Sequence, residues 1–485
     1  MSPLPLSKAL SVSSAAEHKQ IASAETAATT FVNCHIVAPP CEESDRKPID
    51  LVVVLDRSGS MSGSKLDLCK QTLDFLAHEL SPHDRVSLVT YDTYVTTNLR
   101  LTKMTPAGKA LLASKVQGVH AGSCTNLSGG LLAGLEEVQS SSRPDSGEPN
   151  PVQSVLLLTD GLANAGISSR SGLVELLEGV LSKNVSLFTF GYGSDHDAEL
   201  LRELSDLGRG SYYFVQNLDS VSLAFADCLG GLLSVVAQNI KVECVAAANV
   251  SIASLKTKRP VTTNSPSTSY TVDLGDMYAE EERDILVQLT LAAWPAADTD
   301  QPLVTFNVRY ANVLTSSLET TSTSVAVGRP VTVTDASLDA LVVQQKHRIE
   351  TAEALEAAQQ EAQKGNLSGG QDVLRTLKAK IKRDEACFAD KNESFKSTTL
   401  IDDLDECCAA MATTHVYRER GMHRMAGKMQ SHWAQRSNDV EVNVADLCTP
   451  QMAASAMPAP MSKAARFFSA PVNMTPSSAP HTSAS

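Results

Sequence analysis

Between residues 51 and 215, short apolar runs alternate with longer amphipathic segments, and this alternation restricts the possible folds more than any other feature. The apolar runs have the length and β-branched content of buried strands, and they cover residues 51–55, 85–91, 154–159, 185–191 and 212–215. Helical spacing marks the segments between them, at residues 65–80, 106–117, 127–139, 171–183 and 196–207. This order predicts an α/β fold, a doubly wound and mostly parallel open sheet with helices on both faces.

The pattern changes on the carboxyl side of this α/β domain, which we place at residues 48–225. Residues 236–332 contain alternating, β-branched segments separated by Ser, Thr and Pro, which predicts an antiparallel β-sandwich. Residues 335–437 are rich in Ala, Glu, Gln, Lys and Leu, with apolar residues at helical spacing, and predict a helical region. Within it, Asn366 to Gly370 are expected to separate two helices. The chain therefore consists of three folded parts.

Three further segments flank these parts. Residues 1–27 are rich in Ser and Ala without strong periodicity, and are predicted to be a flexible N-terminal arm. Residues 28–47 are predicted to form a strand and a linker that pack on the sandwich. Residues 449–485 hold 9 Ala, 7 Ser and 6 Pro, which predicts a disordered tail.

Charge and hydropathy exclude several kinds of partner. Lys and Arg number 41 and Asp and Glu number 55, so the formal net charge is −14, which gives no electrostatic reason to bind nucleic acid. No stretch of 18 consecutive apolar residues could span a membrane, and the first 20 residues lack the apolar core of a signal peptide. We therefore expect a cytoplasmic protein.

Oxygen-bearing side chains follow the first buried strand directly, in the segment Asp56-Arg57-Ser58-Gly59-Ser60. Ligands of open α/β sheets bind beyond the carboxyl ends of the strands, where this loop must lie. Two later loops should reach the same edge, one with Thr125 and one with Asp160, directly after the run 154–158. Two carboxylates and three hydroxyls suit Mg²⁺ or Ca²⁺, and they form a poor zinc site because imidazole and thiolate are missing.

This arrangement resembles the von Willebrand factor type A (VWA) domain, whose metal-ion-dependent adhesion site reads D-x-S-x-S, then Thr, then Asp. All five positions match, at Asp56, Ser58, Ser60, Thr125 and Asp160. The resemblance implies that the three hydroxyls coordinate a metal directly and that the two carboxylates act largely through water. It implies Mg²⁺, with Ca²⁺ or Mn²⁺ as alternatives, and an open position for an Asp or Glu carboxylate of a partner protein.

A second, looser resemblance extends beyond this domain. The segment Leu274 to Asp284, with residues 432–436 in the helical region, is similar to the part after the VWA domain in plant RING-finger ubiquitin ligases. Those ligases carry an N-terminal RING with paired cysteines and histidine, which this sequence does not supply. Ligase activity is therefore not carried over, whereas a role as an adaptor or substrate-recognition component of ubiquitin ligation stays open.

No enzyme signature is found. A G-x-S-x-G elbow, a P-loop and a dinucleotide fingerprint are all missing. Asp195-His196-Asp197 is interpreted as a loop leading into a helix, with Asp195 as its cap. Arg57 and Lys65 lie near the metal loop in sequence, and either could attract an acidic partner or simply be solvated. The sequence thus predicts a non-enzymatic, cation-dependent protein-binding module, with the adaptor and a structural protein that its metal only stabilises as alternatives.

Overall fold

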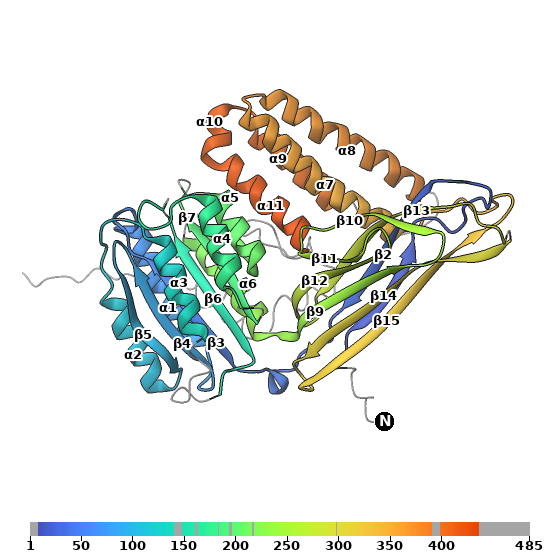
Figure 1. The fold of residues 1–485 in the computed structure, drawn as a ribbon. Helices are drawn as coiled ribbons and strands as arrows, with labels where there is room; N and C mark the ends of the chain where they lie inside the picture. Colours follow the sequence, from blue (N-terminus) through green and yellow to red (C-terminus); the bar gives the residue numbers. More distant parts are fainter. Residues whose placement is uncertain are drawn as a thin grey trace, which may run out of the picture.

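The computed structural model describes residues 8–139, 148–160, 163–182, 184–193, 196–215, 218–296, 298–389 and 398–435. Figure 1 shows three parts: an α/β domain, a β-sandwich beside it, and a layer of helices that lies over both. The predicted fold class, an α/β sheet followed by antiparallel sheets and C-terminal helices, is confirmed. The predicted tail, residues 449–485, lies outside the described residues.

A six-stranded sheet forms the α/β domain. Its strand order is β5-β4-β3-β6-β7-β8, and all neighbours are parallel except β4 and β5. The strands are β3 (Ile49–Asp56), β4 (Arg85–Tyr91), β5 (Val95–Lys103), β6 (Val152–Thr159), β7 (Val185–Tyr192) and β8 (Arg209–Val215). Strands β3, β4 and β7 are buried along their whole length, because helices cover both faces.

Six helices cover this sheet, three on each face. They are α1 (Ser64–Glu79), α2 (Pro106–Gln117), α3 (Leu127–Gln139), α4 (Arg170–Val180), α5 (Ala198–Leu207) and α6 (Leu218–Leu233). Along β3, Leu51 and Val53 pack with α1, α2 and α6, whereas Val52 and Val54 pack with α3, α4 and α5. Successive side chains of a strand point to opposite faces, so one apolar run supplies both layers of the core.

Two antiparallel sheets form the sandwich, in the orders β1-β2-β13-β10 and β11-β12-β9-β14-β15. Their strands are β1 (Ser11–Ala16), β2 (Ala28–Val37), β9 (Val235–Ala246), β10 (Val250–Lys256), β11 (Val261–Ser265), β12 (Ser269–Tyr278), β13 (Glu282–Leu291), β14 (Thr299–Asn312) and β15 (Ser317–Arg329). Buried side chains from both sheets, among them Val32, Val242, Val287 and Phe306, make one apolar core between them.

The N-terminal region corrects one prediction. The sequence predicts a flexible arm over residues 1–27, whereas Ser11–Ala16 form strand β1, which pairs with β2. Residues 1–7 lie outside the described residues. The edge strand β1 has partly exposed Ser and Ala in place of buried apolar residues, so its sequence carries no strand periodicity. Its partner β2 lies in the sandwich beside β13, as expected for the run in residues 28–47.

The helical layer consists of α7 (Ala340–Gln363), α8 (Leu367–Ala389), α9 (Thr398–Ala410), α10 (Thr414–Val416), a π-helical turn (Tyr417–Gly421) and α11 (Met422–Ala434). Its core contains Leu355, Leu374, Leu404, Cys407 and Met425. The predicted break at Asn366 to Gly370 lies too far along the chain. The break covers residues 364–366 and α8 begins at Leu367, because the Asn366 side chain caps this helix by accepting from the amide of Gly369. None of the helices in the described part of the chain combines the length and apolar character needed to cross a membrane.

Helix α11 joins the three parts. The Gln430 side chain accepts from the amide of Tyr212 in β8 at 2.9 Å, and donates to Ser205 Oγ and Asp206 Oδ1 at 3.0 Å each. At the end of α11, Arg283 of the sandwich donates to the carbonyl oxygen of Ala434. Side chains and backbone groups that are buried together in this way hold the helical layer on both other parts (Figure 1).

Candidate metal centre

The carboxyl ends of β3 and β6 place the two predicted carboxylates at one edge of the sheet. These strands are parallel neighbours, with Leu55 opposite Leu158. Asp56 is the last residue of β3, and Asp160 directly follows β6. Two positions that are 104 residues apart in the chain therefore meet beyond the same edge.

The first loop holds its oxygens through short hydrogen bonds. One carboxylate oxygen of Asp56 accepts from the amide of Ser58 at 2.7 Å, and the other accepts from the Thr159 hydroxyl at 2.7 Å. The Ser58 and Ser60 hydroxyls lie 3.2 Å apart, and the Ser60 hydroxyl donates to Asp160 Oδ1 at 2.8 Å. Four of the five predicted residues are thus linked in one group, three of them through their side chains.

The loop that carries Thr125 packs against both others. The carbonyl oxygen of Thr125 accepts from the amides of Asn164 and Ala165, and its own amide donates to the Asn164 side chain at 2.8 Å. Two residues earlier, the carbonyl oxygen of Ser123 accepts from the amide of Gly59 at 2.9 Å. These bonds bring the fifth predicted residue, which is buried, to the same edge of the sheet.

Gly122 permits this close approach of the loops. Its amide donates to the carbonyl oxygen of Arg57 at 2.6 Å. A Cβ atom at this position would lie 1.8 Å from a carboxylate oxygen of Asp92 and 2.9 Å from its Cβ. A residue with a side chain would therefore displace Asp92, which glycine avoids.

Charges around the group are paired within the protein. Lys65, in the first turn of α1, donates to the second carboxylate oxygen of Asp160. Arg57 lies 3.4 Å from a carboxylate oxygen of Asp92. Both basic residues that sequence analysis left open thus have acidic partners in the loops, and Lys65 puts a positive charge directly at the Asp160 carboxylate.

Asp56 is buried, with its side chain removed from water. Burial raises the pKa of the Asp56 carboxyl, because desolvation disfavours the charged form, while hydrogen bonds from Thr159 and Ser58 oppose the rise. A nearby cation would offset the cost of keeping this carboxylate charged.

The donor set fits a hard divalent cation. All its side-chain donors are carboxylate or hydroxyl oxygens, which Mg²⁺ and Ca²⁺ prefer. Adjacent ligands of an octahedral Mg²⁺ lie about 3.0 Å apart, and the oxygens of Ser58, Ser60 and Asp160 lie 3.2 and 2.8 Å apart. Within the described residues no three His, Cys, Asp or Glu side chains cluster as a metal group. A cation at this site would therefore need the hydroxyl oxygens as ligands in addition to the carboxylates.

Several residues that shape this site were not singled out from the sequence. Thr159 and Tyr91 contact Asp56 from the ends of β6 and β4, and Asn164 holds Thr125. A polar residue at the end of an otherwise apolar strand was the available signal for Thr159 and Tyr91. The role of Asn164 depends on the fold of its loop and had no local signal.

In the segment Asp195-His196-Asp197, the two described residues, His196 and Asp197, have structural roles. Helix α5 begins at Ala198, and Asp197 is its cap, because its side chain accepts from the amide of Leu200 at 3.0 Å. The expected cap, Asp195, lies outside the described residues. His196 is buried, with its ring nitrogens 2.5 Å from the Gly193 carbonyl oxygen and 2.6 Å from the Tyr212 hydroxyl oxygen.

The fold is an open, mostly parallel α/β sheet with helices on both faces, and loops at the carboxyl ends of its strands bring hydroxyls and carboxylates together. Comparison of the sequence with family models identifies this domain. Residues 50–226 match the model of the von Willebrand factor type A domain and form a VWA domain.

Relatives and solved structures agree with this assignment. The chain is 33% identical over 257 residues to E3 ubiquitin-protein ligase WAV3 of Arabidopsis thaliana, a match that covers 51% of this chain and 32% of that protein. The chain thus spans only about a third of the length of this curated relative.

Two solved structures share the fold over most of the chain. One is a von Willebrand factor type A protein from Catenulispora acidiphila, with a TM-score of 0.60, 12% identity, and coverage of 82% of this chain and 96% of that one. The other is the ArnB paralog VWA2 from Sulfolobus acidocaldarius, with a TM-score of 0.57, 14% identity, and coverage of 87% and 99%. At this identity the likeness concerns the fold alone.

Proposed function

We propose that this protein is a non-enzymatic, divalent-cation-dependent protein-binding module. One observation carries the proposal: the Ser60 hydroxyl lies between Ser58 Oγ and Asp160 Oδ1, at 3.2 and 2.8 Å. Oxygens from two separate loops converge there at the spacing of ligands to one small cation. The VWA domain over residues 50–226 supports the proposal, because such domains are typically protein-binding modules.

The proposed cation is Mg²⁺, with Ca²⁺ or Mn²⁺ as alternatives. Ser58, Ser60 and Thr125 would hold it through their hydroxyls, and Asp56 and Asp160 would balance its charge. When bound, the ion supplies an open coordination position for a carboxylate of the partner. Ser60 is exposed and Asp56 is buried. A partner would therefore approach from the Ser60 side of the loop, with its Asp or Glu in front.

The experiment is affinity capture from an extract with the full chain as bait, with and without a chelator. Asp56→Ala and Asp160→Ala are compared with Asp67→Ala, which changes an exposed carboxylate on α1. We expect chelator, Asp56→Ala and Asp160→Ala to remove the same set of captured proteins, while Asp67→Ala retains it. Capture that is unchanged by all three treatments would contradict the proposal.

A second candidate function is an adaptor or substrate-recognition component of ubiquitin ligation. The match to WAV3, which extends over 51% of this chain, favours it. Co-purification of a RING protein with the full chain, and its loss on removal of that RING protein's binding region, would support the adaptor. Capture sets without any ubiquitin ligase would argue against it.

The remaining alternative is a metal that only stabilises the fold. In that case chelator lowers the melting temperature and leaves every captured protein in place. The two measurements on the same preparation therefore distinguish a binding role from a structural one.

A further inference from the structure

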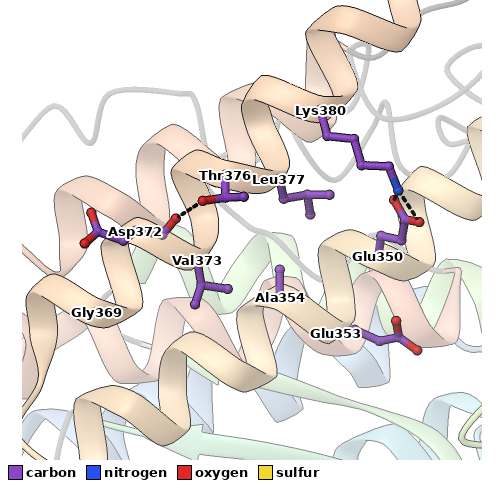
Figure 2. A pocket seen from close by; sticks show the side chains of 9 residues that line it. All are labelled: Glu350, Glu353, Ala354, Gly369, Asp372, Val373, Thr376, Leu377 and Lys380. Atoms are coloured by element: carbon purple, nitrogen blue, oxygen red, sulfur yellow. Dashed lines mark hydrogen bonds and ion pairs between the residues drawn. The ribbon is translucent and has the colours of Figure 1, made fainter.

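A groove of about 570 Å³ runs between α7 and α8 of the helical layer. Figure 2 shows the side chains of Ala354 and Val373 pointing into the space between the two helices, with Leu377 beside them. Val373 and Ala354 are half-buried. The floor of this groove, which we call the α7/α8 groove, is therefore apolar and open to a ligand.

Acidic side chains surround this floor. Glu350, Glu353 and Asp372 line the groove, with Lys380 as the one basic lining residue. The Lys380 ammonium donates to both carboxylate oxygens of Glu350, at 2.6 and 2.7 Å. Glu353 pairs with Lys256 at 2.9 Å and Asp372 pairs with Arg375 at 3.2 Å. Their side chains are still 43% and 73% exposed, so each carboxylate has room for a further cationic group beside its present partner. The groove thus favours a ligand that combines apolar and basic side chains.

The chain contains one segment of this composition beyond the described residues. From Thr449 to Ser485 its only Lys and Arg are Lys463 and Arg466, and its only aromatic residues are Phe467 and Phe468. No Asp or Glu occurs in these 37 residues. The basic pair and the aromatic pair fall within six positions of a sequence that is otherwise Ala, Ser, Pro and other uncharged residues.

The segment can reach the groove. The described residues end at Gln435, which exchanges hydrogen bonds of 2.6 Å with the backbone of Asp284. Three residues before Gln435, the carbonyl oxygen of His432 accepts from Arg348 of α7. Arg348 lies two residues before Glu350, which lines the groove. A linker of the 27 residues from 436 to 462 has a root-mean-square span of roughly 29 Å if it behaves as a random coil. The groove residues on α8, Gly369 to Lys380, extend over about 17 Å at 1.5 Å per residue.

We propose that the α7/α8 groove binds the chain's own segment Lys463 to Phe468. Phe467 and Phe468 occupy the apolar floor over Ala354, Val373 and Leu377. Lys463 and Arg466 pair with Glu353 and Asp372 at its edges. This contact is independent of the metal centre and of the function proposed for it, and it covers a surface that a partner would otherwise meet.

Photo-crosslinking of the full chain tests the proposal. A photoreactive phenylalanine analogue replaces Phe467 in one preparation and Met474, seven positions further on, in another. We expect position 467 to cross-link within the same chain to residues of α7 and α8 that line the groove, and position 474 not to do so. Mass spectrometry identifies the cross-linked peptides.

Two variants separate specific docking from chance contact. Val373→Glu places a charge in the apolar floor and should reduce the groove cross-links roughly tenfold, the effect of losing about 1.4 kcal/mol of binding. Phe468→Ser should reduce them without touching the folded parts. A control change on the exposed face of α8 outside the groove, Ala379→Ser, should leave them unchanged.

The proposal is overturned if position 467 cross-links elsewhere, if the cross-links join two chains, or if they persist in Phe468→Ser. It is also overturned if positions 467 and 474 give the same pattern. A melting curve of Val373→Glu shows whether that variant keeps its fold, and Phe468→Ser decides the question if it does not.

Discussion

The Ser60 hydroxyl donates to Asp160 Oδ1 at 2.8 Å, although 100 residues separate the two positions in the chain. The contact exists because β3 and β6 are parallel neighbours whose carboxyl ends coincide. The meeting of these two side chains is therefore a property of the sheet. It places a hydroxyl and a carboxylate where a divalent cation can bind both.

Lys65 is predicted to weaken cation binding. Its ammonium group contacts Asp160 Oδ2, so it repels a divalent cation held by the same carboxylate. Lys65→Met should raise the affinity for Mg²⁺ roughly tenfold, equivalent to about 1.4 kcal/mol. Isothermal titration of the full chain measures this, with Lys70→Met on the same helix as the control. Equal or weaker binding by Lys65→Met would show that the lysine supports the ion.

Gln430 is predicted to hold the helical layer on the VWA domain. Its side chain satisfies the amide of Tyr212, the hydroxyl of Ser205 and the carboxylate of Asp206. Gln430→Ala leaves these buried groups without that partner and should cost about 2–3 kcal/mol in the free energy of unfolding.

Urea unfolding and hydrogen exchange test this prediction. Gln360→Ala, which changes an exposed glutamine of α7, is the matched control and should cost less than about 0.5 kcal/mol. Faster exchange of the Tyr212 amide is expected in Gln430→Ala alone. Indistinguishable stabilities for the two variants would show that the contact contributes little.

His35 is predicted to make the sandwich more stable in acid. The hydrogen bond with Asp284, 3.0 Å long, raises the pKa of His35 above its value in the unfolded chain, and burial opposes the rise. This contribution is complete below about pH 6.5, the unfolded pKa, and is lost as the pH rises through the folded pKa.

His35→Gln should therefore lose more stability at pH 5.5 than at pH 8.5. Urea midpoints of wild type and variant at both pH values measure the difference, and His120→Gln, at an exposed position, serves as the control. A gap between wild type and His35→Gln that grows with pH would contradict the assigned pairing.

The VWA sheet could be predicted because its central strands are buried on both faces. Leu51 to Leu55 form a continuous apolar run, and such runs occur almost only in parallel sheets covered by helices. The carboxylates at the strand ends then had to share one edge. The candidate site followed from strand order and side-chain chemistry alone.

Other elements could not be predicted, because their sequences carry no period. Strand β5 alternates polar and apolar residues only partly, as expected for an exposed edge. Helix α6 (Leu218–Leu233) has apolar residues on most positions, so no amphipathic pattern separates it from the strands around it. Contacts such as Gln430 with Tyr212 join residues more than 200 positions apart, and no local signal marks them.

We propose that one divalent cation is held by five residues, Asp56, Ser58, Ser60, Thr125 and Asp160. Mn²⁺ titration of the full chain, followed by electron paramagnetic resonance of the free ion, measures this binding. We expect one Mn²⁺ per chain, displaced by Mg²⁺, with at least a roughly tenfold weaker affinity in Ser60→Ala and Thr125→Ala. Asp67→Ala should bind as wild type does. Failure of the wild-type chain to bind Mn²⁺, or unchanged binding in both hydroxyl variants, would contradict a cation site at these residues.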